Sequence, residues 1–254
     1  MEIPSRASAE KGFAKRMSRL TTKHRKRLRG LLGNPPDVRN VPESFWDEVS
    51  RETEETTLLM VYLVFLASAN YHAFGDEAGT DDPLADTLDD QAHAYSQRKS
   101  IEIALSYVKT SRKLVQQLGR EIDELKNVVD VDPETGARTI TRDEDAVPTA
   151  QDLEDGLARA FGPSRAAAVS VTQTTDAQSV GGDAGIAATV GLSDGDIWIT
   201  ETDERVCVIC EPLHLMARRV WRAQYPTGPP AHVNCRCIVG YENGSRSELG
   251  ADVA

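Results

Sequence analysis

The sequence predicts an α+β fold, in which a helical N-terminal half precedes a small α+β C-terminal module with a Cys/His loop. Apolar residues recur near the 3.6-residue helical period through residues 91–128. Residues 196–200 (DIWIT) instead alternate apolar and polar side chains, as a short strand does. All four cysteines lie between Cys207 and Cys237, shortly after that strand. This clustering indicates one site rather than a scattered disulfide framework.

Composition and charge narrow the classes of function. The chain has 254 residues, enough for one or two domains. Aromatic residues make up 6%, too few for an aromatic-lined groove that binds carbohydrate or single strands. Residues 1–30 hold ten Lys or Arg and two Glu, a net +8, which leaves −19 elsewhere because the whole chain carries −11. An acidic body repels phosphate, so any nucleic-acid contact is expected at the basic arm or a small local patch.

Residues 1–33 form the predicted basic arm. Within it, residues 9–30 predict a helix that ends at a glycine, with basic side chains every four residues. Apolar residues such as Phe13 and Met17 are too few to predict a strong core stripe. Two interpretations stay open: a solvated or disordered tail, and an arm that binds phosphate. The candidate DNA-binding residues are Lys11, Lys15, Arg16, Arg19, Lys23, Arg25, Lys26, Arg27 and Arg29.

Residues 34–128 form the predicted helical domain. Asn34-Pro35-Pro36 breaks the chain, and a helix with acidic first turns is expected from Ser44 to about Phe74. The acidic segment 75–90 predicts a loop, after which a second helix is expected over residues 91–128. Two long helices with a loop between them predict an antiparallel hairpin.

Neither a membrane span nor a secretion signal is expected. The uncharged run at residues 58–69 covers ~18 Å as a helix, short of the ~30 Å bilayer core, which favours a buried core helix over membrane contact. Residues 1–4 provide no apolar segment ahead of the basic run, so a cleavable signal is not expected.

The chain after residue 128 predicts a linker and a second domain. Residues 129–150 contain Pro133, Gly136 and Pro148, which favours a linker or an exposed hairpin at a domain boundary. The domain itself is expected over residues 151–243 and a disordered tail over residues 244–254. Its expected elements are helices at 153–161 and 164–175, a flexible turn at Gly181-Gly182, a helix at 184–190 and the strand at 196–200.

The cysteines and a nearby histidine carry the most specific chemical signal. Cys207-x-x-Cys210 sets two thiolates on one turn, which is half of a tetrahedral zinc site, and a second half follows further along the chain. A closed shell of four protein ligands is structural rather than catalytic. The expected cofactor is therefore one structural Zn²⁺, with ligands drawn from Cys207, Cys210, His232 and either Cys235 or Cys237.

Other interpretations of the cysteines stay open. A disulfide between the 207/210 pair and the 235/237 pair would also staple the loop. All four cysteines can instead be plain buried thiols, since free cysteine often packs as a small core residue. Redox chemistry at Cys207-x-x-Cys210 is compatible with a helix that starts near Pro212. It is the less simple interpretation, because it does not explain the second cluster at residues 232–237.

Catalytic interpretations find less support. A zinc deaminase needs His-x-Glu ahead of Pro-Cys-x-x-Cys, and no His-x-Glu occurs in the chain. A Cys-His protease needs a histidine near a cysteine, yet His24, His72 and His93 are expected to be surface or helix filler. His214 is also expected to be filler, with a spare metal ligand as the alternative.

At this point the chain resembles the phage Mu F-like minor head proteins, a head-morphogenesis family. A tryptophan-threonine strand, an aspartate-arginine-valine-cysteine turn and a proline-histidine-cysteine-arginine-cysteine segment follow one another in the family's order. The resemblance covers the C-terminal third and leaves the N-terminal helical half without a counterpart. The segments that carry it are 164–166 (SRA), 167–175 (AAVSVTQTT), 198–200 (WIT), 203–210 (DERVCVIC) and 229–237 (PPAHVNCRC).

The resemblance implies a minor head protein of a tailed phage, which acts near the portal in head assembly and in DNA packaging or delivery. Its implied partners are the portal or capsid proteins, with possible DNA contact through residues 1–30 and neither a membrane nor a small-molecule substrate. It implies a location in the phage head interior, and in the host cytoplasm during assembly. The implied fold is a small α+β module with a compact loop of the zinc-binding type, and no enzymatic activity.

Two departures from the family pattern qualify the resemblance. Thr172-Gln173 stands where the family often has Thr-Glu, which weakens a catalytic role for that helix. The interval 211–228 is long and predicts an inserted helix with Arg218, Arg219, Trp221 and Arg222, either a solvated face or a basic patch.

Two other classes of function remain as alternatives. Related modules resemble ADP-ribosyltransferases, but Arg165, Thr200 and Glu201 or Glu204 fit that scheme loosely, and no Glu-x-Glu turn is present. A zinc-stabilised DNA-binding protein is disfavoured by the acidic body.

Overall fold

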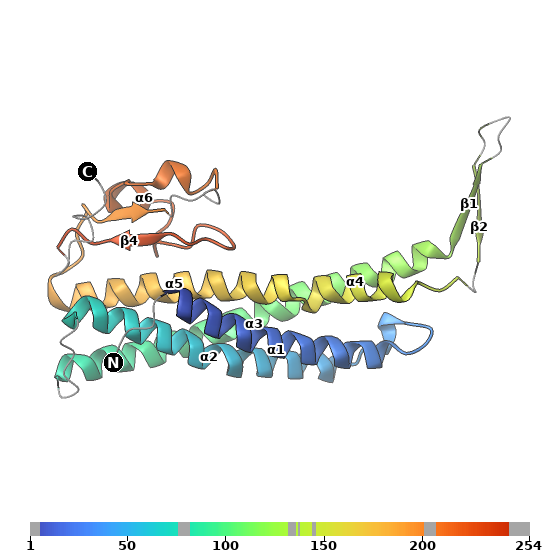
Figure 1. The fold of residues 1–254 in the computed structure, drawn as a ribbon, viewed down its shortest axis with the longest axis horizontal. Coiled ribbons are helices and arrows are strands. Elements are labelled where there is room, and N and C mark those ends of the chain that lie inside the picture. Colours follow the sequence, from blue (N-terminus) through green and yellow to red (C-terminus); the bar gives the residue numbers. More distant parts are fainter. Residues whose placement is uncertain are drawn as a thin grey trace. The chain divides into compact units, whose positions relative to one another are not determined.

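The computed structural model describes residues 6–75, 82–131, 136, 138–143, 146–200 and 207–243. It is mostly helical, with a small antiparallel sheet near the C-terminus (Figure 1). The helices are α1 (Arg6–Leu32), α2 (Glu43–Phe74), α3 (Pro83–Leu125), α4 (Ala150–Phe161), α5 (Pro163–Thr189) and α6 (Arg218–Trp221), with 3₁₀ turns η1 (Val38–Asn40) and η2 (Glu211–Leu213). The strands are β1 (Asn127–Val131), β2 (Arg138–Arg142), β3 (Ile197–Ile199) and β4 (Ile238–Gly240).

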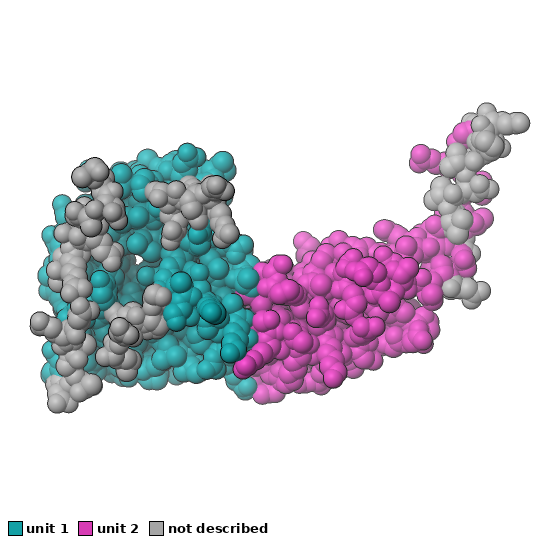
Figure 2. All heavy atoms as spheres, in the orientation of Figure 1, with its two compact units in different colours: residues 1–17, 54–102, 167–254 teal, residues 18–53, 103–166 magenta. Residues whose placement is uncertain are grey.

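The chain divides into two compact units, which Figure 2 colours separately. Unit 1 comprises residues 1–17, 54–102 and 167–254, and unit 2 comprises residues 18–53 and 103–166. Each unit combines residues from before and after the segment 129–150. The packing therefore joins parts of the chain that the sequence separates widely.

Helix α1 confirms the expected basic helix, but the expectation that it lacks a core stripe is wrong. Its apolar side chains recur every three or four residues, so they fall on one side of the helix. That spacing makes a narrow but continuous apolar stripe, which a count of apolar residues underestimates. The buried members of the stripe are Phe13, Met17, Leu20, Leu28 and Leu32.

His24 is a second correction on α1, since its side chain is 2% exposed rather than surface filler. Its ring lies 5.6 Å from that of Phe161 and 6.5 Å from that of Phe45, edge to face in both pairs. Its Nε2 lies 3.1 Å from Glu52 Oε2. Burial lowers the pKa of His24, although the Glu52 carboxylate opposes that shift. In unit 2 this histidine is a core residue with one polar partner.

Helices α2 and α3 form the expected antiparallel hairpin (Figure 1). The hydroxyl of Tyr62 on α2 donates to Asp89 on α3. The expected loop at residues 75–90 is shorter than predicted, because α3 already begins at Pro83, while residues 76–81 lie outside the described part. Asp82 starts the helix, since its Oδ1 accepts from the backbone N–H of Leu84 at 2.8 Å. Proline is well suited to the first helical turn, where no N–H is required.

The apolar segment of α2 is partly buried. Val61 and Phe65 are buried in unit 1, whereas Leu59 and Leu63 are 43% and 46% exposed. Within the described residues, α2 is the one helix long and apolar enough to cross a membrane, and 39% of its most apolar window is buried. Core helices of soluble proteins pass the same test.

Helix α5 runs through the positions where a flexible turn was expected, so that prediction is wrong. Gly181 and Gly185 lie one helical turn apart and face the backbone of α2. A Cβ atom would lie 2.3 Å from the carbonyl oxygen of Phe65 at the first position, and 2.2 Å from that of Ala69 at the second. Glycine here permits close helix packing rather than a bend.

Residues 127–131 and 138–142 pair as two strands, which matches the exposed hairpin, one of the two alternatives expected for this segment. Strands β1 and β2 pair antiparallel, with Asn127 opposite Arg142. Helix α4 follows, as expected, and begins with a reciprocal cap. The Thr149 hydroxyl accepts from the backbone N–H of Asp152, while the Asp152 carboxylate accepts from the backbone N–H of Thr149. The expected tail at residues 244–254 lies outside the described residues.

Candidate metal centre

A two-stranded sheet and three aromatic rings frame the Cys/His loop in unit 1. Strands β3 and β4 pair antiparallel with Trp198 opposite Val239, which confirms the expected strand around residue 198. Trp198 is fully buried, and its ring centroid lies 5.6 Å from that of Trp221 and 5.4 Å from that of Tyr225. Cys210, Cys235 and Cys237 belong to the same buried cluster. The aromatic core therefore fixes the sheet and the cysteines in one compact module.

The first half of the site is a tight turn. The backbone N–H groups of Cys210 and Glu211 donate to the Cys207 carbonyl at 3.0 and 2.9 Å. The turn brings both thiols to the same side and leads directly into η2. Residues 201–206, which precede it, lie outside the described part of the chain.

The second half is another short turn, which ends in β4. The backbone N–H of Cys235 donates to the carbonyl of His232 at 3.2 Å. Asn234 occupies the left-handed region with a φ of 63°, where asparagine is one of the few tolerated side chains. This turn directs His232 and Cys235 toward the first half of the site.

The candidate ligands form two groups that share Cys210. Cys207, Cys210 and His232 make one group and Cys210, Cys235 and Cys237 the other, with the ligand atoms of each within 4.8 Å of one another. His232 Nε2 lies 2.9 Å from Cys207 Sγ and 3.0 Å from Cys210 Sγ. Cys210 Sγ lies 3.8 Å from Cys235 Sγ. The structure thus brings all five predicted ligands together, with Cys210 at the centre.

The donor set fits a tetrahedral zinc ion. Zinc–sulfur bonds of ~2.3 Å at tetrahedral angles place two sulfurs about 3.8 Å apart, which matches the separation of Cys210 and Cys235. His232 Nδ1 lies 2.7 Å from the carbonyl of Val233, which only accepts, so Nδ1 carries the proton and Nε2 presents its lone pair. A zinc ion would hold Nε2 and sulfur ~3.5 Å apart, so binding requires His232 to move outward by about half an ångström.

The thiols differ in how readily they ionise. The pKa of Cys235 is lowered to about 5, chiefly because the Cys237 thiol donates to it, with help from backbone N–H groups. Burial and the neighbouring Cys235 thiolate raise the pKa of Cys210 to about 12. Hydrogen bonding to Cys235 and burial raise the pKa of Cys237. Of these three cysteines, Cys235 therefore ionises most readily.

All four cysteines of the chain are free thiols in the structure. The sulfur atoms of Cys210 and Cys235 lie 3.8 Å apart, while a disulfide bond measures ~2.05 Å. The arrangement is that of converging metal ligands rather than of a formed bridge.

Two threonines of α5 hold the second turn in place, and sequence reasoning missed both. Thr175 Oγ1 donates to the carbonyl of Cys235 at 2.6 Å. Thr172 Oγ1 accepts from the backbone N–H of Asn234 at 2.9 Å. Their three-residue spacing puts both hydroxyls on one face of the helix. No local pattern identifies such contacts, since they join residues about 60 positions apart in the sequence.

Arg6, at the start of α1, is a further residue that the sequence did not single out. Its guanidinium donates to Thr175 Oγ1 at 2.6 Å and also to the carbonyl of Arg236. Glu10 balances its charge through an ion pair of 2.7 Å. The first turn of α1 therefore forms hydrogen bonds with the Cys/His loop and with α5, and it supplies none of the candidate metal ligands.

A cluster of ion pairs around Arg218 lies in the same module as the sheet. Arg218 Nε lies 3.0 Å from Asp196 Oδ2, and its two terminal nitrogens donate to Asp183 at 2.6 and 2.9 Å. Tyr241 also donates to Asp183, at 2.9 Å. The expectation that the helix at residues 218–222 is a solvated basic face is wrong for Arg218, which is 5% exposed. Arg222 is exposed and pairs with Asp194.

The other candidate site residues lie elsewhere. His214 Nδ1 lies 3.0 Å from the Thr200 hydroxyl, and His214 belongs to neither ligand group. In unit 2, the Arg165 guanidinium lies 4.3 Å from the ring centroid of Tyr107 and donates to the carbonyl of the same residue. Glu201 and Glu204 lie outside the described residues.

The predicted DNA-binding residues of α1 fall into two sets. Lys23 pairs with Glu52 at 2.6 Å, while Arg27 and Arg29 pair with Glu48 and Glu154. These pairs offset part of the positive charge on α1 within unit 2. Arg25 is half-buried. The second set is exposed and forms no ion pair within the described residues: Lys11, Lys15, Arg16, Arg19 and Lys26.

The geometry therefore provides a buried Cys/His group that can hold a metal ion. Comparisons of the chain with protein-family models, with curated proteins and with solved structures find no match.

Proposed function

We propose that the protein is a minor head protein of a tailed phage, whose C-terminal module is held together by one structural zinc ion. The observation that carries the proposal is the resemblance of residues 164–237 to the Mu F-like family. Within that stretch, the strand and cysteine motifs lie in unit 1, where Trp198 packs in the same core as Cys210 and Cys235. Motifs that belong to one module are expected to lie close together in the folded chain.

The zinc ion has a structural role in this proposal. Cys207, Cys210, His232 and Cys235 supply four protein ligands, which leaves no coordination position for a substrate. Cys237 lies beside Cys235 and orients it by donating a hydrogen bond. Bound zinc would contribute folding free energy by tying the two turns together.

The basic helix α1 is the proposed contact for packaged DNA. The exposed Lys11, Lys15 and Arg16 present positive charge, and no partner carboxylate is recorded for them within the described residues. The remainder of the chain is acidic, so contact with DNA would be confined to this helix. The portal or the capsid is the proposed protein partner, and the phage head the proposed location.

Peptide mapping of purified phage particles tests the location. Particles from the strain that encodes the chain are digested before and after genome release, and tryptic fragments of the chain are sought in both samples. Fragments in full heads support a minor head protein, and their loss with the DNA supports an ejected one. Absence from all particles overturns the proposal.

The salt dependence of DNA binding tests the arm. Each phosphate neutralised contributes a slope of ~0.9 in log affinity against log salt, so replacing Lys11, Lys15 and Arg16 with alanine should reduce the slope by roughly three. Replacing Lys23, Arg27 and Arg29 instead is the matched control, because these residues already pair with carboxylates. Equal losses from the two triple variants, or a slope near zero, would refute the DNA contact.

A further inference from the structure

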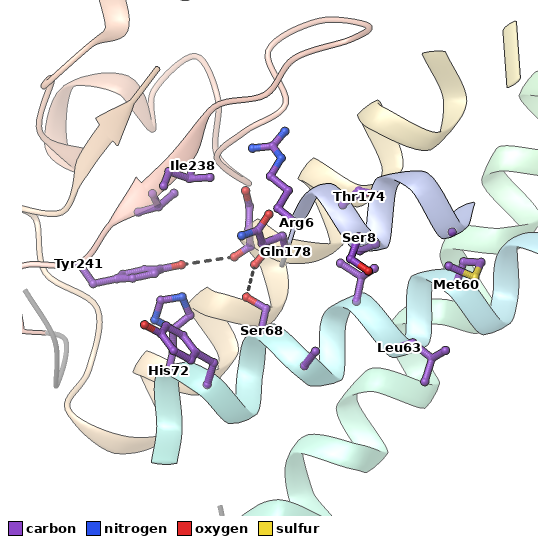
Figure 3. A pocket seen from close by; sticks show the side chains of 17 residues that line it. Arg6, Ser8, Met60, Leu63, Ser68, His72, Thr174, Gln178, Ile238 and Tyr241 are labelled. Carbon is purple, nitrogen blue, oxygen red and sulfur yellow. Dashed lines mark hydrogen bonds between the residues drawn. The ribbon is translucent and has the colours of Figure 1, made fainter. Parts of the chain in front are cut away.

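Unit 1 contains a cavity of about 460 Å³ whose lining includes none of the candidate metal ligands and none of the candidate DNA-binding residues (Figure 3). It lies among the first turns of α1, the C-terminal half of α2, the middle of α5 and strand β4. Its volume is within the ~300–1,000 Å³ range of small-molecule sites. Most of its wall surface is apolar, and the aliphatic side chains in the wall include Met60, Leu63, Val64, Ala67, Ile238 and Val239.

Two buried polar atoms in the wall have no partner. Thr174 is 1% exposed, and neither its Oγ1 nor Oε1 of Gln178 has a hydrogen-bond partner within the described residues. Both residues line the cavity and are labelled in Figure 3. Two other polar side chains in the wall have partners: Ser68 Oγ donates to the Gln178 carbonyl at 2.7 Å, and Tyr241 donates to Asp183 at 2.9 Å. Buried polar atoms are normally paired, so these two point to a missing ligand.

The charged groups in the wall are already balanced. Arg6 is paired with Glu10 at 2.7 Å. His72 is neutral near neutral pH, because burial lowers its pKa to about 4. No unpaired charge among the described lining residues would therefore compensate an ionised ligand, and burying one would be costly.

We propose that this cavity binds a neutral amphiphile, which consists of an aliphatic chain and a hydroxyl head group. The chain lies against Met60, Leu63 and Val64 of α2, and the hydroxyl pairs with Thr174 and Gln178 of α5. A hydroxyl both donates and accepts, so it satisfies the threonine hydroxyl and either end of the glutamine amide. The proposal does not depend on the phage function, since it uses neither the zinc ligands nor the basic residues.

The first test compares three probes with the same chain length and different head groups. Titration of the full-length protein with 1-decanol, decanoate and decyltrimethylammonium is followed by calorimetry. The proposal expects 1-decanol to bind at one site, at least about tenfold more tightly than either charged probe, because an uncompensated buried charge is costly. Equal binding of all three, or no binding of 1-decanol, overturns it.

The second test locates the site. Ala67→Phe fills the cavity and should abolish 1-decanol binding, while Leu59→Phe adds the same ring to an exposed position of α2 outside the cavity. Thr174→Val removes the unpaired hydroxyl at nearly constant shape, so thermal stability should be unchanged or higher while 1-decanol affinity falls about five- to tenfold. Unchanged 1-decanol affinity in both Ala67→Phe and Thr174→Val would place the binding elsewhere and refute the proposal.

Discussion

The hydroxyl of Thr175 donates a hydrogen bond of 2.6 Å to the carbonyl of Cys235, and this bond ties the second half of the metal site to helix α5. The same hydroxyl accepts from Arg6 at 2.6 Å. One threonine thus connects α1, α5 and the ligand loop. Loss of the metal ion should therefore loosen the loop around this anchor while the long helices persist.

Cys210→Ser should remove metal binding, because Cys210 belongs to both ligand groups. Changes outside the ligand set often cost ~10–100-fold in metal affinity, so loss of this thiolate should cost more than about a hundredfold. Cys207→Ser, at a half-buried position, should destabilise the module less. Metal content by native mass spectrometry and protease resistance of residues 207–243 are the measurements. Full zinc occupancy and unchanged resistance in Cys210→Ser would contradict the site.

Arg218→Met should destabilise unit 1 by about 3–5 kcal/mol, because it leaves the buried carboxylate of Asp196 and the half-buried carboxylate of Asp183 without their cation. Arg222→Met is the matched control on the same short segment. Its exposed pair with Asp194 should contribute only ~0–1 kcal/mol. Urea denaturation of both variants measures the difference, and equal midpoints would show that the buried cluster is not an important source of stability.

Gly181→Ala and Gly185→Ala should each destabilise unit 1 by about 1–3 kcal/mol, since the new methyl group would collide with the α2 backbone. Gly30→Ala on α1 provides the control. A Cβ at that position meets nothing within 4 Å, so alanine should stabilise the helix by about 0.5–1 kcal/mol. Thermal unfolding followed by circular dichroism distinguishes the two directions. A stabilising Gly185→Ala would show that the two helices can separate at no cost.

Acid should weaken unit 1 through His72. Its pKa is lowered from 6.5 to about 4 in the folded chain by burial, so the unfolded chain binds the proton more readily between those values. Stability should therefore be fully present above about pH 6.5 and fall by about 3 kcal/mol as the pH approaches 4. His72→Gln should flatten this dependence in urea titrations at several pH values, with His93→Gln as the control for the loss of an exposed histidine. The same acid dependence in His72→Gln as in the parent protein would rule out this assignment.

The sequence predicted those features that depend on local pattern. The hairpin of α2 and α3 follows from helical periodicity, and the convergence of Cys207, Cys210 and His232, which could hold a metal ion, follows from their spacing. Even there, Ile101 and Leu105 of the predicted apolar face are exposed. Periodicity therefore predicts the position of a helix more reliably than it predicts which face of the helix is buried.

The features that the sequence did not predict depend on distant neighbours. The length of α5 was missed because Gly181-Gly182 is typical of a turn unless another backbone passes close to it. Arg218 looked like a surface cation because Asp183 and Asp196 lie 35 and 22 residues earlier in the chain. The cavity has no sequence signal, since its wall is assembled from four separate elements.

The segments that make up unit 1 also determine how late in translation this unit can complete its folding. Residues 1–17 leave the ribosome long before residues 167–254, with which they share unit 1. Until then, the side chains of Phe13 and Met17 have no completed core to enter, and contacts between such distant segments form slowly. Nascent chains should therefore expose an apolar stripe that holding chaperones can bind. Unit 1 should reach its native packing only after synthesis of residues 167–254.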